Sequence, residues 1–209
     1  MMLAKWIVAE ASNRAAFDEA QRRWSELVGY EGFIVQVGGW LDSSTTKAGV
    51  LAVWRDFGAY RGCIESGYHD LAAGQRDTIQ RIEISVASVI MRINQSNPQV
   101  LAETAEVVRV SDATLEANSS PIFVARQMEI WNPVLAAADG MLGALICRVD
   151  GNRDRFLAAS FWQNRGALEN FDQKIFPATR KQAGMQSYVK ELIIYHFGLE
   201  PSWHVVKHA

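Results

Sequence analysis

The stretch Val53-Trp54-Arg55-Asp56-Phe57-Gly58-Ala59-Tyr60 has a counterpart in the second half of the chain, Phe161-Trp162-Gln163-Asn164-Arg165-Gly166-Ala167-Leu168. In both copies an apolar segment ends on tryptophan, and a Gly-Ala pair lies in the helix expected next. A turn with glycine at both ends precedes each copy, Gly29-Tyr30-Glu31-Gly32 in the first half and Gly140-Met141-Leu142-Gly143 in the second. Because three features recur in the same order, the sequence predicts an internal repeat.

The elements around the first copy follow from the spacing of apolar residues. Ser12 is placed to cap a first helix, with Phe17 and Trp24 on its buried face. A second helix carries Tyr60 and Ile64 on one face. Strands are expected where apolar and β-branched residues are dense, at 3–9, 33–40, 49–54 and 81–92.

The second half repeats this order. Ser120-Pro121 opens a helix that runs to about residue 139, because proline is favoured at the first helical position, and Pro133 should kink or break it. A later helix runs through Leu168 and Ile175. The expected strands are 105–110, 142–149, 156–162 and 188–197.

Each half therefore reads β-α-β-β-α-β, which folds as a four-stranded antiparallel sheet with both helices on one face. The predicted fold class is α+β, with two tandem ferredoxin-like repeats packed as a dimeric-α/β-barrel-type unit. We expect a first repeat at 1–95, a linker at 96–103, a second repeat at 104–197 and a tail at 198–209. Since the strands carry apolar residues on both sides, the bare faces of the two sheets should pack together, with the ligand between them.

Composition excludes several functional classes. The 209 residues have a net charge of −2, and the basic residues are scattered, so we expect no nucleic-acid partner. No segment approaches the ~20 apolar residues that span a bilayer, and residues 1–10 do not resemble a signal peptide. Cys63 and Cys147 lie in different halves and are expected to be reduced, buried thiols. The sequence thus predicts a cytoplasmic protein with no membrane partner.

The first 95 residues also resemble a known group of proteins. The residues that carry the resemblance are Lys5-Trp6, 21–24, Gly32-Phe33, Gly38-Gly39-Trp40, Val53-Trp54, Tyr60 and His69-Asp70. They are similar to the dimeric α/β-barrel superfamily, which includes antibiotic-biosynthesis-monooxygenase-like proteins, and more narrowly to an uncharacterised bacterial family typified by YdbC. The resemblance implies the fold, but the superfamily contains oxygenases, isomerases, haem enzymes and binding proteins.

His69 and Asp70 are the candidate catalytic residues. A histidine can act as a general base near neutral pH, and a carboxylate can fix its tautomer. The matching place in the second half holds Pro177-Ala178, so a functional centre is expected in the first half. The alternative is a histidine at a helix end that interacts with the helix dipole.

Four aromatic residues are candidate ligand-binding residues: Trp24, Trp40, Trp54 and Tyr60. They could line a pocket for a flat aromatic substrate. Trp24 and Tyr60 lie at helical spacing, where aromatic residues usually belong to the core, whereas Trp40 and Trp54 end strands and are favoured as residues at the mouth of a cavity. His196 could ligate haem iron, but a half-buried strand histidine is the simpler interpretation. His204 and His208 lack accompanying ligands, so we predict no metal site.

Three functions remain open. The first is a small-molecule-binding, monooxygenase-like enzyme that needs no cofactor and acts on an apolar or aromatic molecule. The second is a non-catalytic ligand-binding or stress-response protein on the same scaffold. The third, a haem protein, has less support, because no basic cluster is present to hold propionates. We also expect a homodimer, formed through edge strands or helices.

Overall fold

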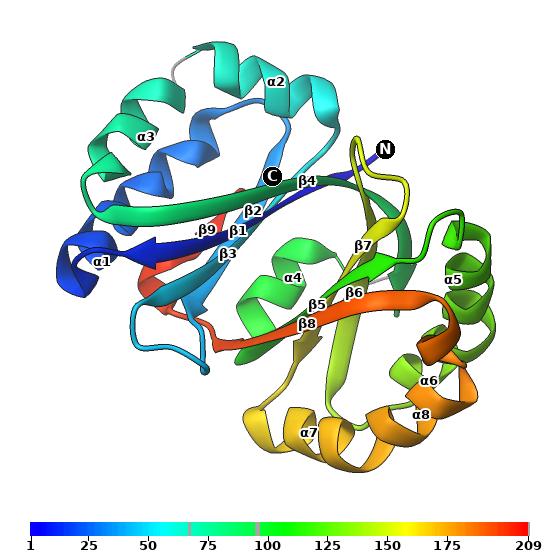
Figure 1. Cartoon of the computed structure of the whole chain (residues 1–209). Coiled ribbons are helices and arrows are strands. Elements are labelled where there is room, and N and C mark those ends of the chain that lie inside the picture. Colours follow the sequence, from blue (N-terminus) through cyan, green and yellow to red (C-terminus); the bar gives the residue numbers. More distant parts are fainter. Residues whose placement is uncertain (67, 95–96, 209) are drawn as a thin grey trace.

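The computed structural model describes residues 1–66, 68–94 and 97–208, and of residues 68–71 it describes the backbone alone. The described residues form one nine-stranded antiparallel sheet, in the order β8-β5-β7-β6-β4-β1-β3-β2-β9 (Figure 1). The strands are β1 (Leu3–Ala11), β2 (Phe33–Trp40), β3 (Lys47–Trp54), β4 (Ile79–Ile93), β5 (Val107–Leu115), β6 (Met141–Val149), β7 (Arg155–Trp162), β8 (Val189–Gly198) and β9 (Val205–Val206).

Helices cover one face of this sheet in two groups, one for each half of the chain (Figure 1). The first group is α1 (Arg14–Arg22), the 3₁₀ helix η1 (Arg23–Gly29), α2 (Phe57–Ser66) and α3 (Tyr68–Arg76). The second is α5 (Ser120–Arg126), η2 (Gln127–Trp131), α6 (Asn132–Ala136), α7 (Arg165–Asn170), η3 (Phe171–Ile175) and α8 (Phe176–Gln182), in which η2 and η3 are π-helical turns. A short 3₁₀ helix, η4 (Met185–Ser187), precedes β8.

The repeat and the α+β fold are confirmed by the strand register. Leu3 pairs with Trp54 in the first half, and Val107 pairs with Trp162 in the second. Both halves therefore have the same strand order, β4-β1-β3-β2 and β8-β5-β7-β6. Counting from these pairs, Lys5 and Arg109 occupy equivalent positions in the two repeats.

The two four-stranded sheets are joined edge to edge, and their inner faces pack together as expected. β4 pairs with β6 on one side, and on the other side β8 approaches β2 through a bridge between Leu41 and Phe197. The amide of Glu200 also donates to the carbonyl of Gly38 at this seam. The sheet thus closes into a barrel, as an eight-stranded sheet can.

The interior of the barrel is filled with buried apolar side chains, among them Trp6, Val37, Leu145 and Phe197. The expected ligand space between the two inner faces is therefore taken up by packing. The two cavities described below lie on the opposite face, between the sheet and its helices. Alternation along β1 explains this arrangement, because Trp6 points into the barrel while Lys5 points towards the helices.

The structure confirms some of the predicted helix boundaries and differs at others. Asn13, not Ser12, caps α1, because its side chain accepts a hydrogen bond from the amide of Ala16. Ser120 begins α5 as expected, but the helical segment ends at Ala136. Helix α4 (Pro98–Thr104) occupies most of the expected linker and the first residue of the expected second repeat, and its Leu101 packs into the barrel interior.

The tail returns to the first half of the chain. It forms a 3₁₀ turn, η5 (Pro201–Trp203), and β9 then pairs with β2. Trp203 is fully buried, and its indole nitrogen donates to Asp18 over 2.7 Å. In the part of the chain that is described, no helix is both long enough and apolar enough to cross a membrane.

Candidate functional site

A cavity of about 330 Å³ lies between the sheet and the helices of the first half, and we call it the first-half cavity. Its floor includes Lys5 and Ile7 of β1, and Phe17 of α1 and Trp24 of η1 form a wall. Residues of β4 also line it, and among them the apolar side chain of Ile84 is 50% exposed. The other lining residues are Ala9, Gln21, Gln36, Val50, Ala72, Gln75, Arg76, Ile79, Gln80, Arg81 and Ile82.

Lys5 brings an ionisable amine to the floor of this mostly apolar cavity. The residue is 4% exposed, and burial lowers the pKa of its amine from 10.5 to about 8. Its Nζ lies 5.7 Å from the centre of the Tyr60 ring. Burial likewise raises the pKa of the nearby Cys63 thiol to about 11, so Cys63 stays neutral. Near pH 8 the Lys5 amine is present in both forms, and it can accept a proton or hold an anion.

Hydrogen-bonded glutamines fix the helical wall of the first-half cavity. The indole nitrogen of Trp24 donates to Oε1 of Gln75 over 2.9 Å, and Nε2 of Gln75 donates to Oε1 of Gln21 over 2.8 Å. This chain ties η1, α3 and α1 together. The orientation of the Trp24 ring is therefore set before any ligand enters.

Gln36 of β2 lies on the floor of the same cavity with an unused donor. The residue is 3% exposed, and its Nε2 has no hydrogen-bond partner among the described residues. Buried polar groups in proteins are nearly always hydrogen-bonded, so such a donor indicates a place for an acceptor.

A smaller cavity of about 50 Å³, the second-half cavity, lies at the equivalent place in the second repeat. Phe123, Gln127 and Trp131 line it as Phe17, Gln21 and Trp24 line the first. The tryptophan follows the glutamine by four positions instead of three, and the π-helical turn η2 accommodates the additional residue. Three further aromatic side chains, those of Phe156, Phe171 and Phe176, also line it.

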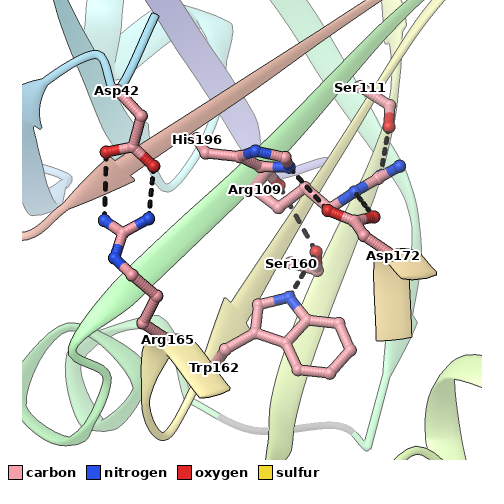
Figure 2. Close-up of polar contacts among 8 residues, drawn as sticks. All are labelled: Asp42, Arg109, Ser111, Ser160, Trp162, Arg165, Asp172 and His196. Atoms are coloured by element: carbon pink, nitrogen blue, oxygen red, sulfur yellow. Dashed lines mark hydrogen bonds and ion pairs between the residues drawn. The ribbon is translucent and has the colours of Figure 1, made fainter. Parts of the chain in front are cut away.

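Arg109 occupies the place of Lys5 in the second-half cavity and is held by a polar network (Figure 2). Its Nε donates to Oδ1 of Asp172 over 2.9 Å, and its Nη1 donates to Ser111. Nε2 of His196 lies 2.9 Å from the other carboxylate oxygen of Asp172 (Figure 2). Burial by itself raises the pKa of Asp172, but the contact with His196 and the charge of Arg109 outweigh it and hold that pKa below its usual range.

The predicted ligand-binding aromatics are distributed over three places. Trp24 lines the first-half cavity. Trp54 and Tyr60 pack against each other in a core cluster next to Lys5, with ring centres 5.8 Å apart. Trp40 lies beside the tail, 5.3 Å from the ring of Trp203.

The histidines have different surroundings. The backbone of His69 and Asp70 belongs to α3, which supplies Ala72 and Gln75 to the first-half cavity, but their side chains lie outside the described residues. His196 turns Nε2 to Asp172. His204 is half-buried, and burial lowers its pKa. Within the described residues, no three metal-ligating side chains cluster.

Sequence reasoning did not identify Lys5, Gln36, Arg109 or Asp172 as site residues. The sequence does contain a pattern that could have identified Lys5 and Arg109. A basic residue stands at the same register position of an apolar strand in both repeats, and a helix-facing position in such a strand is normally apolar. Gln36 and Asp172 have no comparable signal, because a polar residue in a strand or an amphipathic helix is unremarkable.

Comparison with known proteins finds relatives of the first half. Residues 3–87 match the model of a domain of unknown function, DUF4937. The uncharacterized protein YdbC of Bacillus subtilis (strain 168) is 35% identical over 92 residues, covering 41% of this chain and 76% of YdbC. The segment matched by the domain model contains all the residues that line the first-half cavity.

Solved structures share the fold over the whole chain. A suspected monooxygenase from Fusobacterium nucleatum has a TM-score of 0.78 at 10% identity, covering 100% of this chain and 95% of that chain. An anthrone oxidase-like protein has a TM-score of 0.72 at 11% identity, covering 100% and 94%. A suspected monooxygenase from Lactobacillus acidophilus has a TM-score of 0.71 at 13% identity, covering 100% and 97%. At these identities the likeness establishes the ferredoxin-like dimeric α/β-barrel fold and no particular reaction.

Proposed function

The chain belongs to the family of the uncharacterized Bacillus subtilis protein YdbC, and we propose that it binds a flat, weakly acidic aromatic small molecule in the first-half cavity. One observation carries the proposal: the buried amine of Lys5 lies at the floor of a largely apolar cavity. Ligand sites typically combine apolar walls with a few convergent polar groups, in volumes of ~300–1,000 Å³. The 330 Å³ of the first-half cavity suit a ligand of two or three fused rings.

The walls favour a flat aromatic body. Phe17 and Trp24 offer ring surfaces, and Ile7 and Val50 of the sheet offer an apolar surface opposite them. Aromatic rings gain from offset or edge-to-face contacts beyond the burial of area. The fixed orientation of Trp24 reduces the entropy lost when such a ligand binds.

Lys5 suits the acidic group of the ligand. A neutral amine accepts the proton of a phenol or enol, and the resulting ammonium then lies beside the anion that it has created. This ion pair is formed away from water, where charges interact more strongly than in bulk solvent. Burial makes the Lys5 ammonium costly, and the anion of a bound ligand would offset part of that cost.

The reaction that fits such an anion is oxygenation by O₂ without a cofactor, as in the conversion of an anthrone to an anthraquinone. The methylene group loses two hydrogens and gains one oxygen atom, and the other oxygen atom leaves as water. The substrate gives up four electrons and O₂ accepts four. The fold shared with an anthrone oxidase-like protein supports the choice of this substrate class.

Anthrone binding and oxygen uptake test the proposal. Wild-type protein is expected to bind anthrone and to consume one O₂ for each anthraquinone formed. Lys5→Met should weaken binding and abolish the turnover, whereas Lys190→Met, which changes an exposed lysine, should do neither. Equal behaviour of Lys5→Met and wild type would contradict the proposal. Binding without oxygen uptake would identify a non-catalytic binding protein.

His69 remains a proposed catalytic residue of the same site. Its place in α3 is one helical turn before Ala72, a lining residue of the first-half cavity. His69→Ala is expected to leave folding intact and to slow turnover or weaken binding. Unchanged kinetics in this variant would remove His69 from the site and leave the proton transfer to Lys5.

A further inference from the structure

Two polar side chains stand in one row on the floor of the first-half cavity. Lys5 pairs with Ala52 of β3, and Ala52 in turn pairs with Gln36 of β2. Residues in such a row lie on the same face of the sheet, one strand spacing of ~4.8 Å apart, so the Cα atoms of Lys5 and Gln36 are about 10 Å apart. The short side chain of Ala52 lies between them.

The side-chain amide of Gln36 has a donor, Nε2, that is unsatisfied within the described residues. Its neighbours Val35 and Val37 point into the barrel interior, so Gln36 points to the helix-covered face. There Nε2 is buried and lacks a hydrogen-bond partner among the described residues. A leucine would fit the same apolar surroundings without this cost, so the amide is expected to serve a ligand.

The two ends of the row differ in charge. Lys5 carries a titratable amine, whereas Gln36 is neutral and offers N–H groups. A neutral amide donor needs no charged partner, so an uncharged carbonyl oxygen is a sufficient acceptor for it. In the second repeat Arg109 replaces Lys5, but Ala144 takes the place of Gln36, so that repeat lacks the second donor.

We infer that the ligand carries two oxygen functions at opposite ends of its flat body, an acidic hydroxyl that faces Lys5 and a carbonyl oxygen that accepts a hydrogen bond from Gln36. This inference rests on the proposed function and narrows its substrate class to hydroxy-ketones of fused-ring aromatics. Phe17 and Trp24 hold the rings between the two polar ends. Gln36 is the residue that sets specificity for the second oxygen.

Three matched naphthalenes test the inference by calorimetry: 6-acetyl-2-naphthol, 6-ethyl-2-naphthol, which lacks the carbonyl, and 2-acetylnaphthalene, which lacks the hydroxyl. Wild-type protein should bind 6-acetyl-2-naphthol about tenfold more tightly than 6-ethyl-2-naphthol, the effect of one hydrogen bond of ~1.4 kcal/mol. Gln36→Leu should lose this preference and leave the affinity for 6-ethyl-2-naphthol unchanged. Lys5→Met should weaken both naphthols and leave 2-acetylnaphthalene unchanged.

The two variants also distinguish a failure of the inference about Gln36 from a failure of the proposed function. Folding is not at risk in Gln36→Leu, because the substitution removes an unsatisfied buried donor. If wild-type protein binds the acetyl and ethyl naphthols equally, or if Gln36→Leu keeps the preference, the inference about the second oxygen is wrong while the proposed function stands. If neither naphthol binds, or if Lys5→Met binds both as wild type does, the proposed function itself fails.

Discussion

Two buried cations, Lys5 and Arg109, occupy equivalent residue positions, and they differ in how the protein compensates their charge. Arg109 has the carboxylate of Asp172 at 2.9 Å. Lys5 lies at the floor of the first-half cavity, and its lowered pKa reports that burial outweighs the favourable interactions of its charge. Stability should therefore respond in opposite directions when the two sites are altered.

Lys5→Met is expected to stabilise the free protein at pH 7. A pKa lowered from 10.5 to about 8 corresponds to about 3 kcal/mol of cost for keeping the ammonium buried. The cost is present in full below pH 8, because folding must then bury a charged amine. It disappears as the pH rises from 8 to 10.5, where the unfolded chain binds the additional proton. Urea unfolding of wild type and Lys5→Met across this range measures the difference, and a gap that does not narrow would contradict the assignment.

Asp172→Asn is expected to destabilise the protein by about 3 kcal/mol, because it leaves the charge of Arg109 buried without a carboxylate. The matched control is Asp42→Asn, which breaks the exposed pair with Arg165 (Figure 2) and should cost ~1 kcal/mol at most. The wild-type advantage should be lost as the pH falls through the lowered pKa of Asp172. Equal losses for the two variants in chemical denaturation would show that the Arg109 network is not a buried charge pair.

At the scale of elements, periodicity predicted the strands and helices, but not their terminal and irregular parts. Ser12 and Asn13 are both good capping residues, and the choice between them depends on the path of the chain leaving β1. The π-helical turns η2 and η3 depend on packing around the second-half cavity, so the local sequence does not predict them. Helix α4 is too short to be stable by itself, so its formation depends on the contact with the barrel interior, which the local sequence does not reveal.

The seam between β2 and β8 depends on glycine. A Cβ atom at Gly39 would lie 1.9 Å from the carbonyl oxygen of Gly198, a backbone atom that cannot move aside. Gly39→Ala should therefore open the seam and destabilise the protein by about 3 kcal/mol. Gly62→Ala in α2 is the control, since a Cβ there meets nothing within 4 Å and alanine favours helices by ~1 kcal/mol. Thermal unfolding of both variants checks this, and an unchanged Gly39→Ala would show that the barrel is not closed at this seam.

At the scale of the whole molecule, the repeat in the sequence was sufficient to predict two ferredoxin-like units. It was not sufficient to predict where a ligand fits. The strands are apolar on both faces, and from that pattern alone either face can be the one that meets the other repeat. In the structure Lys5 and Gln36 lie on the helix side, where they line the cavity, while Trp6 and Val37 belong to the packed interior. The helical spacing of Trp24 indicated a buried position, and the structure has this residue in the wall of the first-half cavity, whereas Trp40 and Trp54, the strand-end residues favoured for a cavity mouth, do not line it.

Assembly is a second prediction at this scale. In the described structure β4 pairs with β6 from Ala87 onward, and the carbonyl of Val86 accepts from the amide of Asp150, so this edge of β4 is available for another strand from Ile79 to Ser85. We expect a homodimer in solution, formed through such edges or through helices. Small-angle scattering should give twice the 23.3 kDa chain mass at micromolar concentrations. A monomer mass throughout that range would contradict it.

The location of the ligand is the central claim, and a crystal structure with bound 2-naphthol tests it most directly. The account predicts density for the two rings between Phe17, Trp24 and the sheet, with the naphthol oxygen within hydrogen-bonding distance of Nζ of Lys5. Density inside the barrel or in the second-half cavity, with an empty first-half cavity, would contradict it.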